Sequence, residues 1–237
     1  MAISVTIILS GMNQESSALS SLVGRWTFNE PTGTIAKDTS GNNHDGTING
    51  ATHLPLKDCK SGHCLGFDGV DDSVSVGSLG IDTDTKPFSI VAWVKPDATT
   101  INDGTGRSIV QEGSTPNNSG NGEFYVDFSL NSSYGPGALV FDMGATQSYA
   151  VIKYTQNVLV GGQWNRVAVT YDGSRTADGM KIYVNGVEQQ TTTTPTSGFS
   201  GTAIPRDQWS IGTQVGGFNP FGGSIDTTSI FTSVVKP

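Results

Sequence analysis

The sequence predicts an all-β protein, a two-sheet antiparallel β-sandwich. Its 31 glycines, 10 prolines and long Ser, Thr and Asn tracts leave no window for an amphipathic helix of ordinary length. Short runs in which apolar and polar residues alternate, such as VDDSVSV at 70–76, are typical of strands. The 237 residues fit one core, since single sandwiches reach roughly 200–250 residues. We therefore expect one main domain.

The expected elements begin with aromatic runs separated by turns rich in Gly, Asn and Asp. GRWTFNE at 24–30 predicts a strand through Trp26 and Phe28, and DTSGNNHDG at 38–46 predicts a tight loop. Phe67 precedes an Asp-Gly turn and an alternating strand. Further strand-like blocks follow: FSIVAWVKPD at 88–97, QWNRVAVTYDG at 163–173, MKIYVNGVEQ at 180–189 and FGGSID at 221–226.

The order and spacing of these blocks resemble the concanavalin-A-like, laminin-G-like jelly rolls over about residues 22–231. The resemblance implies a jelly-roll domain at 22–237 and an N-terminal extension at 1–21. Relatives usually continue after the Ile-Asp pair with an acidic residue, where this chain has Thr227 and Thr228. That departure weakens the transfer of family features at this end.

The N-terminal extension contains a short apolar run, ISVTIIL at 3–9. It is too short for a membrane span and lacks the basic flank of a signal peptide. Ile3, Val5 and Ile7 share one face of a predicted strand that needs a sheet edge. We expect that edge in the same domain or in a neighbouring subunit, which makes these residues candidates for assembly contacts.

The only two cysteines, Cys59 and Cys64, lie in CKSGHC, where a turn can close a small disulfide loop. We predict this disulfide and hence an oxidising setting, either extracellular or on a particle surface. Two alternatives remain: a pair of free thiols, and a zinc site that adds some of His44, His53 and His63.

Calcium is the better metal hypothesis, because hard cations prefer several carboxylate and carbonyl oxygens and the 38–46 loop is rich in Asp and Asn. The resemblance implies a structural calcium held by Asp38, a backbone carbonyl near Asn43, and Asp226. The alternative is that Asp38 and Asn43 bond only within their own turn.

Aromatic side chains are candidates for sugar contact. Trp26, Trp93, Trp164 and Trp209 lie in strand-like blocks, so we expect them in the core or packed on a sheet. The aromatic residues in irregular stretches are freer to meet a ligand; they are Tyr134, Tyr149, Phe218 and Phe221. The first three are our candidate ligand-binding residues.

Catalysis is not expected. Glycoside hydrolases of this fold carry carboxylates at alternating positions of one strand, and no E-x-D-x-E pattern occurs here. Glu123 and Asp127 share a strand face but would lie about 13 Å apart. The histidines lack any accompanying nucleophile motif.

The net charge of −8 disfavours nucleic acid as a partner. Two functions remain. The first is a non-catalytic structural subunit of an extracellular or virion surface assembly, which associates with itself or with neighbouring subunits. The second is a free-standing carbohydrate-binding or adhesion module. Fold alone does not choose between them.

Overall fold

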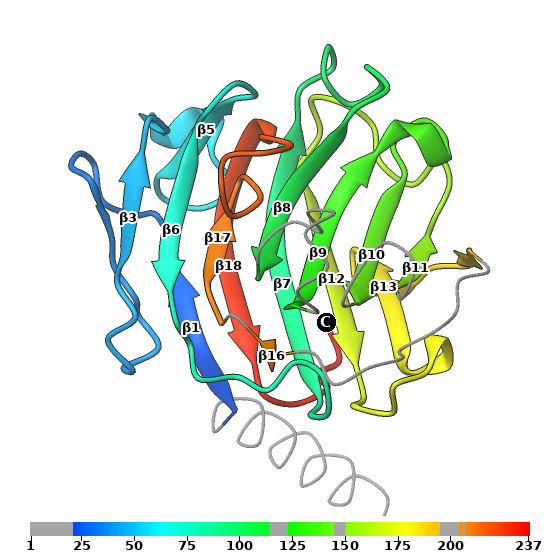
Figure 1. Ribbon diagram of the computed structural model, residues 1–237. Helices are drawn as coiled ribbons and strands as arrows, with labels where there is room; N and C mark the ends of the chain where they lie inside the picture. The colour runs from blue at the N-terminus through cyan, green and yellow to red at the C-terminus, as the bar shows by residue number, and fades with distance from the viewer. Residues whose placement is uncertain (1–20, 114–122, 145–149, 195–203, 206) are drawn as a thin grey trace, which may run out of the picture.

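The computed structural model describes residues 21–113, 123–144, 150–194, 204–205 and 207–237, which form two sheets packed face to face (Figure 1). Sheet A has eight strands in the order β14-β13-β12-β7-β18-β5-β4, with β1 also paired to β18. Sheet B has ten strands in the order β15-β11-β10-β9-β8-β17-β6-β3-β2, with β16 also paired to β9. All pairings between these strands are antiparallel except the one between β16 and β9. The predicted two-sheet antiparallel sandwich is confirmed.

The strands of sheet A are β1 (Leu22–Trp26), β4 (Thr52–Leu54), β5 (Cys64–Asp68), β7 (Phe88–Pro96), β12 (Asn165–Tyr171), β13 (Met180–Val184), β14 (Val187–Glu188) and β18 (Gly222–Phe231). Those of sheet B are β2 (Ile35–Ala36), β3 (Gly46–Asn49), β6 (Ser73–Gly77), β8 (Gly106–Glu112), β9 (Glu123–Asn131), β10 (Leu139–Gly144), β11 (Ala150–Tyr154), β15 (Thr192–Thr193), β16 (Ile204–Pro205) and β17 (Trp209–Ile211). The short 3-10 helices are η1 (Leu56–Asp58), η2 (Ser132–Tyr134) and η4 (Ala177–Gly179). None of the helices in the described ranges has the length and hydrophobicity that crossing a membrane requires.

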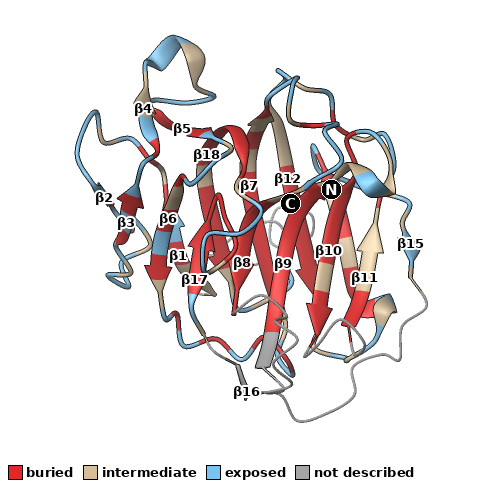
Figure 2. Cartoon of the chain, turned by 45° about the horizontal axis from the view of Figure 1, so that its top comes forward, coloured by how far each residue is buried: buried red, intermediate tan, exposed pale blue. Residues whose placement is uncertain are grey.

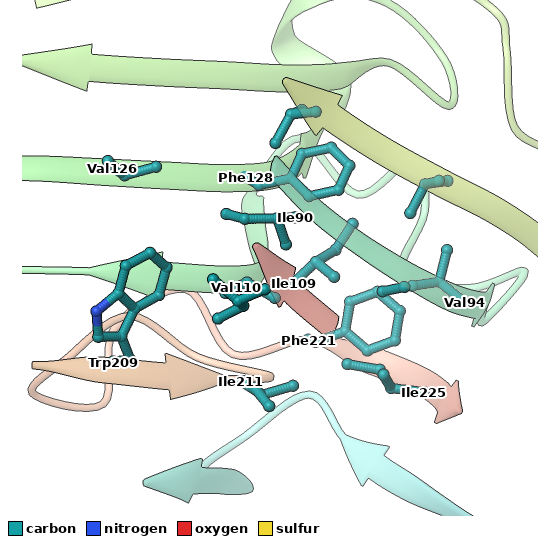
Figure 3. Packing of buried hydrophobic residues seen from close by; sticks show 14 of the residues in the cluster. Ile90, Val94, Ile109, Val110, Val126, Phe128, Trp209, Ile211, Phe221 and Ile225 are labelled. Atoms are coloured by element: carbon teal, nitrogen blue, oxygen red, sulfur yellow. The ribbon is translucent and has the colours of Figure 1, made fainter. Parts of the chain in front are cut away.

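The core lies between the two sheets and is built from alternate residues of the central strands, which are the most buried parts of the chain (Figure 2). In Figure 3, Ile90 of sheet A lies next to Phe128 of sheet B. Phe88 of β7 adds an edge-to-face contact with Phe141 of β10, with ring centroids 6.1 Å apart. Since inward positions are apolar, each intervening residue points away from the core.

A bulge in β8 decides which of its residues face outward. The register shifts between Ser108 and Val110, so Ile109 and Val110 are both buried in the core. Beyond the bulge the alternation resumes, and Gln111 lies opposite Asp127 of β9. The bulge therefore leaves Ser108 and Gln111 together on the outer face of sheet B.

The last strand, β18, lies in the middle of sheet A and pairs with β7, β5 and β1. Its pairing with β7 is interrupted between Asp226 and Ser229, where Thr227 has a positive φ of 28°. This bulge falls at Thr227 and Thr228, directly after the Ile225-Asp226 pair. The predicted strand through Ile3, Val5 and Ile7 lies outside the described residues.

Candidate functional site

A polar row crosses three neighbouring strands on the outer face of sheet B. Gln111 of β8 pairs with Asp127 of β9, and Asp127 pairs with Asp142 of β10. Residues directly opposite on antiparallel strands have Cβ atoms about 4.5–5.5 Å apart. The alternation in FYVDFSL and LVFDMG turns Val126, Phe128 and their neighbours inward and both aspartates outward. We call Gln111, Asp127 and Asp142 the polar row.

Asp127 is the most enclosed member of the polar row, with 8% of its surface exposed. Its Oδ1 accepts a hydrogen bond from Ser108 Oγ (2.6 Å) and its Oδ2 accepts one from Gln214 Nε2 (3.3 Å). Burial raises the pKa of this carboxyl, although the hydrogen bonds from Ser108, Ser129 and Gln214 oppose the shift.

Asp142 faces Asp127 and accepts a hydrogen bond from the Tyr125 hydroxyl (3.0 Å). Burial, followed by the neighbouring charge of Asp127, raises the pKa of Asp142 to about 8. The carboxyl pair therefore holds a proton at neutral pH, as expected when two acids share a buried site.

Gln111 is fully buried, and only one end of its amide is satisfied. Its Oε1 accepts a hydrogen bond from Val215 N (2.5 Å), whereas its Nε2 has no hydrogen-bond partner in the described part of the chain. A buried N–H group without an acceptor lowers the free energy of unfolding by about 1–3 kcal/mol, unless another group accepts a hydrogen bond from it. This amide is therefore suited to meet an acceptor that is not part of the described chain.

Two of the predicted ligand-binding residues lie beside the polar row. Tyr134 stacks on Tyr154, with ring centroids 4.4 Å apart, and Tyr154 pairs with Val140 next to Asp142 on the same strand. Burial and the charge of Asp142 raise the pKa of Tyr134. Phe218 is 55% exposed.

The loop that carries Phe218 is tied to the polar row. The Phe218 carbonyl accepts a hydrogen bond from Gln214 N (2.8 Å), and the side chain of Gln214 binds Asp127. Tyr149 lies outside the described residues. Phe221 was expected in an irregular stretch but is buried in the core, edge-to-face with Phe67 at 6.2 Å, so it is no ligand candidate.

The predicted calcium residues are engaged with their own loops. Both oxygens of Asp38 accept hydrogen bonds, from the backbone N–H groups of Arg25, Ser40 and His44 and from Ser40 Oγ. Burial raises the pKa of Asp38, but these bonds outweigh it and leave the pKa lowered. Asp226 accepts hydrogen bonds from Ser61 N (2.8 Å) and Thr227 Oγ1 (3.0 Å).

A different acidic group has the spacing of metal ligands. Carboxylate oxygens of Asp68, Asp71 and Asp72 lie within 4.8 Å of one another at the turn after β5. Among the described residues no other group of at least three acidic, His or Cys side chains meets this spacing. Sequence reasoning noticed the turn but not the grouping. Asn43 has the positive φ of a turn residue, 63°.

The outer face of sheet A is covered by the disulfide loop. Cys59 and Cys64 form the predicted disulfide, which excludes the alternatives of free thiols and of a zinc site with cysteine ligands. Lys60 Nζ lies 4.3 Å from the ring centroid of Trp93, and Trp164 Nε1 donates to the carbonyl of Asp58 (3.3 Å). These two tryptophans are packed on the sheet, as expected, but on its outer side, whereas Trp26 and Trp209 are in the core.

The comparisons with known proteins agree with this architecture. The sequence profile described as "Concanavalin A-like lectin/glucanases superfamily", a laminin-G-type profile, matches residues 68–237. The chain therefore belongs to this superfamily. No curated protein matches the chain in sequence.

Similar solved structures include binding domains of larger proteins. The botulinum neurotoxin serotype D binding domain is 13% identical with a TM-score of 0.64, and the match covers 92% of this chain and 49% of that one. The binding domain of botulinum neurotoxin DC, in complex with rat synaptotagmin II, is 16% identical with a TM-score of 0.59 and the same coverages. A mutant Trypanosoma rangeli sialidase is 13% identical with a TM-score of 0.57, at 92% and 31% coverage. The chain thus spans half or less of these proteins, and at such identity they show the fold alone.

Proposed function

We propose that this domain is a non-catalytic module that binds carbohydrate through the outer face of sheet B. The observation that carries the proposal is the unpaired, buried Gln111 amide beside the two carboxyl groups of Asp127 and Asp142. Membership of a superfamily whose description includes lectins supports it, as does the likeness in fold to neurotoxin binding domains.

The chemistry of the polar row suits a sugar. A sugar hydroxyl both donates and accepts, so it can accept from Gln111 Nε2 while donating to a carboxyl oxygen. Binding sites typically combine a few such polar groups with aromatic surface. The stacked rings of Tyr134 and Tyr154 offer that surface next to Asp142.

We also propose that the carboxyl pair binds rather than cleaves. Retaining glycosidases need two carboxyls about 5–5.5 Å apart, one of them free to attack the sugar. Here Asp127 is enclosed and bonded to Ser108, Ser129 and Gln214, and Asp142 accepts from Tyr125. Both acids are thus held by their own neighbours rather than poised for attack.

Calcium remains part of the proposal as a structural ion, but the site implied by the resemblance fits it poorly. An ion between Asp38 and Asp226 would have to replace the hydrogen bonds that these carboxyls now accept. The group of Asp68, Asp71 and Asp72 has oxygen spacing that could hold a metal.

The disulfide is consistent with an extracellular or particle-surface location. The other functional hypothesis, a structural subunit of an assembly, depends on Ile3, Val5 and Ile7, which lie outside the described residues. It is supported by none of the contacts given above, so the binding module is the better-supported function.

The test is binding of the purified full chain to a printed glycan array, with the variants Tyr134→Ala, Tyr154→Ala and Phe218→Ala. We expect at least one glycan to bind and its affinity to fall about tenfold or more when Tyr134 or Tyr154 is truncated, since an aromatic contact is lost. Tyr183→Ala is the matched control, because Tyr183 lies half-buried on β13 of the other sheet. Retention of all binding by the three variants would place the site elsewhere, and release of reducing sugar from a bound glycan would show catalysis instead.

A further inference from the structure

We infer that this site selects uncharged or amino-bearing sugars and rejects glycans that present a carboxylate, sulfate or phosphate to it. The inference rests on the proposed carbohydrate-binding function and names the class of glycan. It follows from which charges the polar row contains and which it lacks.

The charged groups that the structure places in the polar row are acids. Asp127 and Asp142 are cross-strand neighbours, and each is buried or half-buried. The third member, Gln111, offers a neutral amide. An anionic group of a ligand would therefore meet like charge, without a compensating positive charge from the row itself.

The basic side chains of the same strands are turned away. Arg107 of β8 donates from one guanidinium nitrogen to the carbonyls of Gly69 and Pro220, each at 2.9 Å. Lys153 of β11 donates to the carbonyl of Met180 in sheet A, at 2.9 Å. Neither group is directed at the outer face of sheet B, where Asp142 and Asp127 lie.

The connecting segments bring no positive charge by their composition. Residues 114–122, 145–149 and 195–203 contain no Lys, Arg or His, whatever their placement. In the segments outside the described residues, Arg206 is the single basic side chain. It precedes Asp207, whose backbone N–H donates to Glu112 near the end of β8.

Sites that take carboxylates, sulfates or phosphates generally supply Arg or Lys, often with two parallel hydrogen bonds from one guanidinium. A site of two buried acids and a neutral amide supplies the opposite pattern. The net charge of −8 adds a longer-range repulsion of anions. An ammonium group on a sugar would instead be attracted to the negative charge that remains on the pair of Asp127 and Asp142.

The experiment compares matched glycans on the array with the full chain. Each neutral glycan that binds is paired with its sialylated, uronic or sulfated counterpart, and N-acetylated chito-oligosaccharides are paired with their deacetylated forms. We expect the anionic counterparts to bind at least tenfold more weakly than the neutral glycans, and the deacetylated forms to bind at least as well as the acetylated ones. Equal or stronger binding of the anionic members would overturn the inference while leaving the proposed function standing. No binding to any glycan would overturn both.

Double variants test the cause, because the pair shares one proton and either carboxyl alone can still carry the negative charge. Asp127→Asn with Asp142→Asn should reduce the discrimination to about threefold or less. Asp127→Ser with Asp142→Asn serves the same purpose if the first chain has a lowered melting temperature. Asp178→Asn with Glu188→Gln is the control, since it removes two acids at exposed positions. Discrimination that persists unchanged in the double variants would show that the carboxyl pair does not cause it.

Discussion

At the scale of single residues, Glu112 shows how a buried acid links protonation to folding. It ends β8 fully buried and accepts hydrogen bonds from Thr83 Oγ1 and Asp207 N, both at 3.0 Å. Burial is the main cause that raises the pKa of Glu112 to about 7, and the two hydrogen bonds oppose it. Above that pH the folded protein contains a buried charge.

We predict that the free energy of unfolding falls as the pH rises from about 4.5 to above 7. The pKa of Glu112 is higher in the folded chain than in the unfolded one, so the folded chain binds more protons in this range and loses that advantage as the pH rises. Glu112→Gln should make the fall smaller, by up to roughly 3 kcal/mol. Urea unfolding at pH 5 and pH 8 measures this.

The control for Glu112 is Glu188→Gln, at an exposed position paired with Lys181, which should keep the original pH dependence. Asp142, with its pKa raised to about 8, contributes a second fall of the same sign, so Glu112→Gln should not abolish the effect. A Glu112→Gln chain with the pH profile of the original would show that this carboxyl is not responsible.

Residue patterns revealed only part of the site. The sequence placed Asp127 on a strand and Tyr134 and Phe218 in irregular segments, and these positions are observed, since Tyr134 ends a short 3-10 helix and Phe218 lies in a loop. It missed that Asp142 faces Asp127, because which residues lie opposite depends on the register set by turn geometry. An Asp flanked by apolar residues in both FYVDFSL and LVFDMG was the available signal.

At the scale of elements, the disulfide loop acts as a cover for the outer face of sheet A. The Asp226 carboxylate of β18 accepts a hydrogen bond from the backbone N–H of Ser61. Lys95 of β7 donates a hydrogen bond to the carbonyl of Asp58, at 2.9 Å. The Cys59–Cys64 bond joins the end of η1 to the start of β5. The loop is thus fixed both covalently and by hydrogen bonds to the sheet.

We predict that replacing both cysteines by serine lowers the free energy of unfolding by about 2 kcal/mol, as chain entropy predicts for so short a loop. Trp93 should also become more accessible to acrylamide, because the Lys60 side chain over its ring is less firmly held. Urea unfolding and fluorescence quenching measure the two effects. In a Trp93→Phe background the change in quenching should become smaller, and what remains reports on Trp164, which donates to Asp58 of the same loop. Unaltered quenching in the serine variant would mean that hydrogen bonds alone hold the loop.

The elements themselves were predictable because apolar and polar residues alternate along them. The blocks at 88–97, 163–173 and 180–189 contain β7, β12 and β13. The bulge in β8 was not foreseen, since one extra residue in a run of apolar side chains leaves no distinct pattern. That bulge determines that Gln111 faces outward, so the site depends on a feature hidden from the sequence.

At the scale of the whole molecule, the two functional hypotheses predict different masses in solution. For a binding module we expect light scattering to give the mass of one chain, 24.8 kDa. A large ordered particle in the light-scattering and negative-stain measurements would favour the structural subunit. Loss of that particle on deleting residues 1–10 would then assign the contact to the segment with Ile3, Val5 and Ile7.

The melting temperature of the chain, measured with calcium and with a chelator, tests whether a calcium ion binds. We expect calcium to raise the melting temperature, since it binds the folded chain. Loss of the response in Asp226→Asn would support the site implied by the resemblance, and loss in Asp71→Asn would support the acidic turn. A melting temperature indifferent to both treatments would remove calcium from the proposal.

The central place of β18 in sheet A has a consequence for synthesis on the ribosome. This strand is the last described one to be made, yet β5, β7 and β1 all pair with it. Until it emerges, the earlier strands of sheet A have no partner on one side, and exposed strand edges invite pairing with other chains. Folding of the sandwich must therefore wait until β18 has left the ribosome, and chains released before Gly222 should aggregate rather than fold.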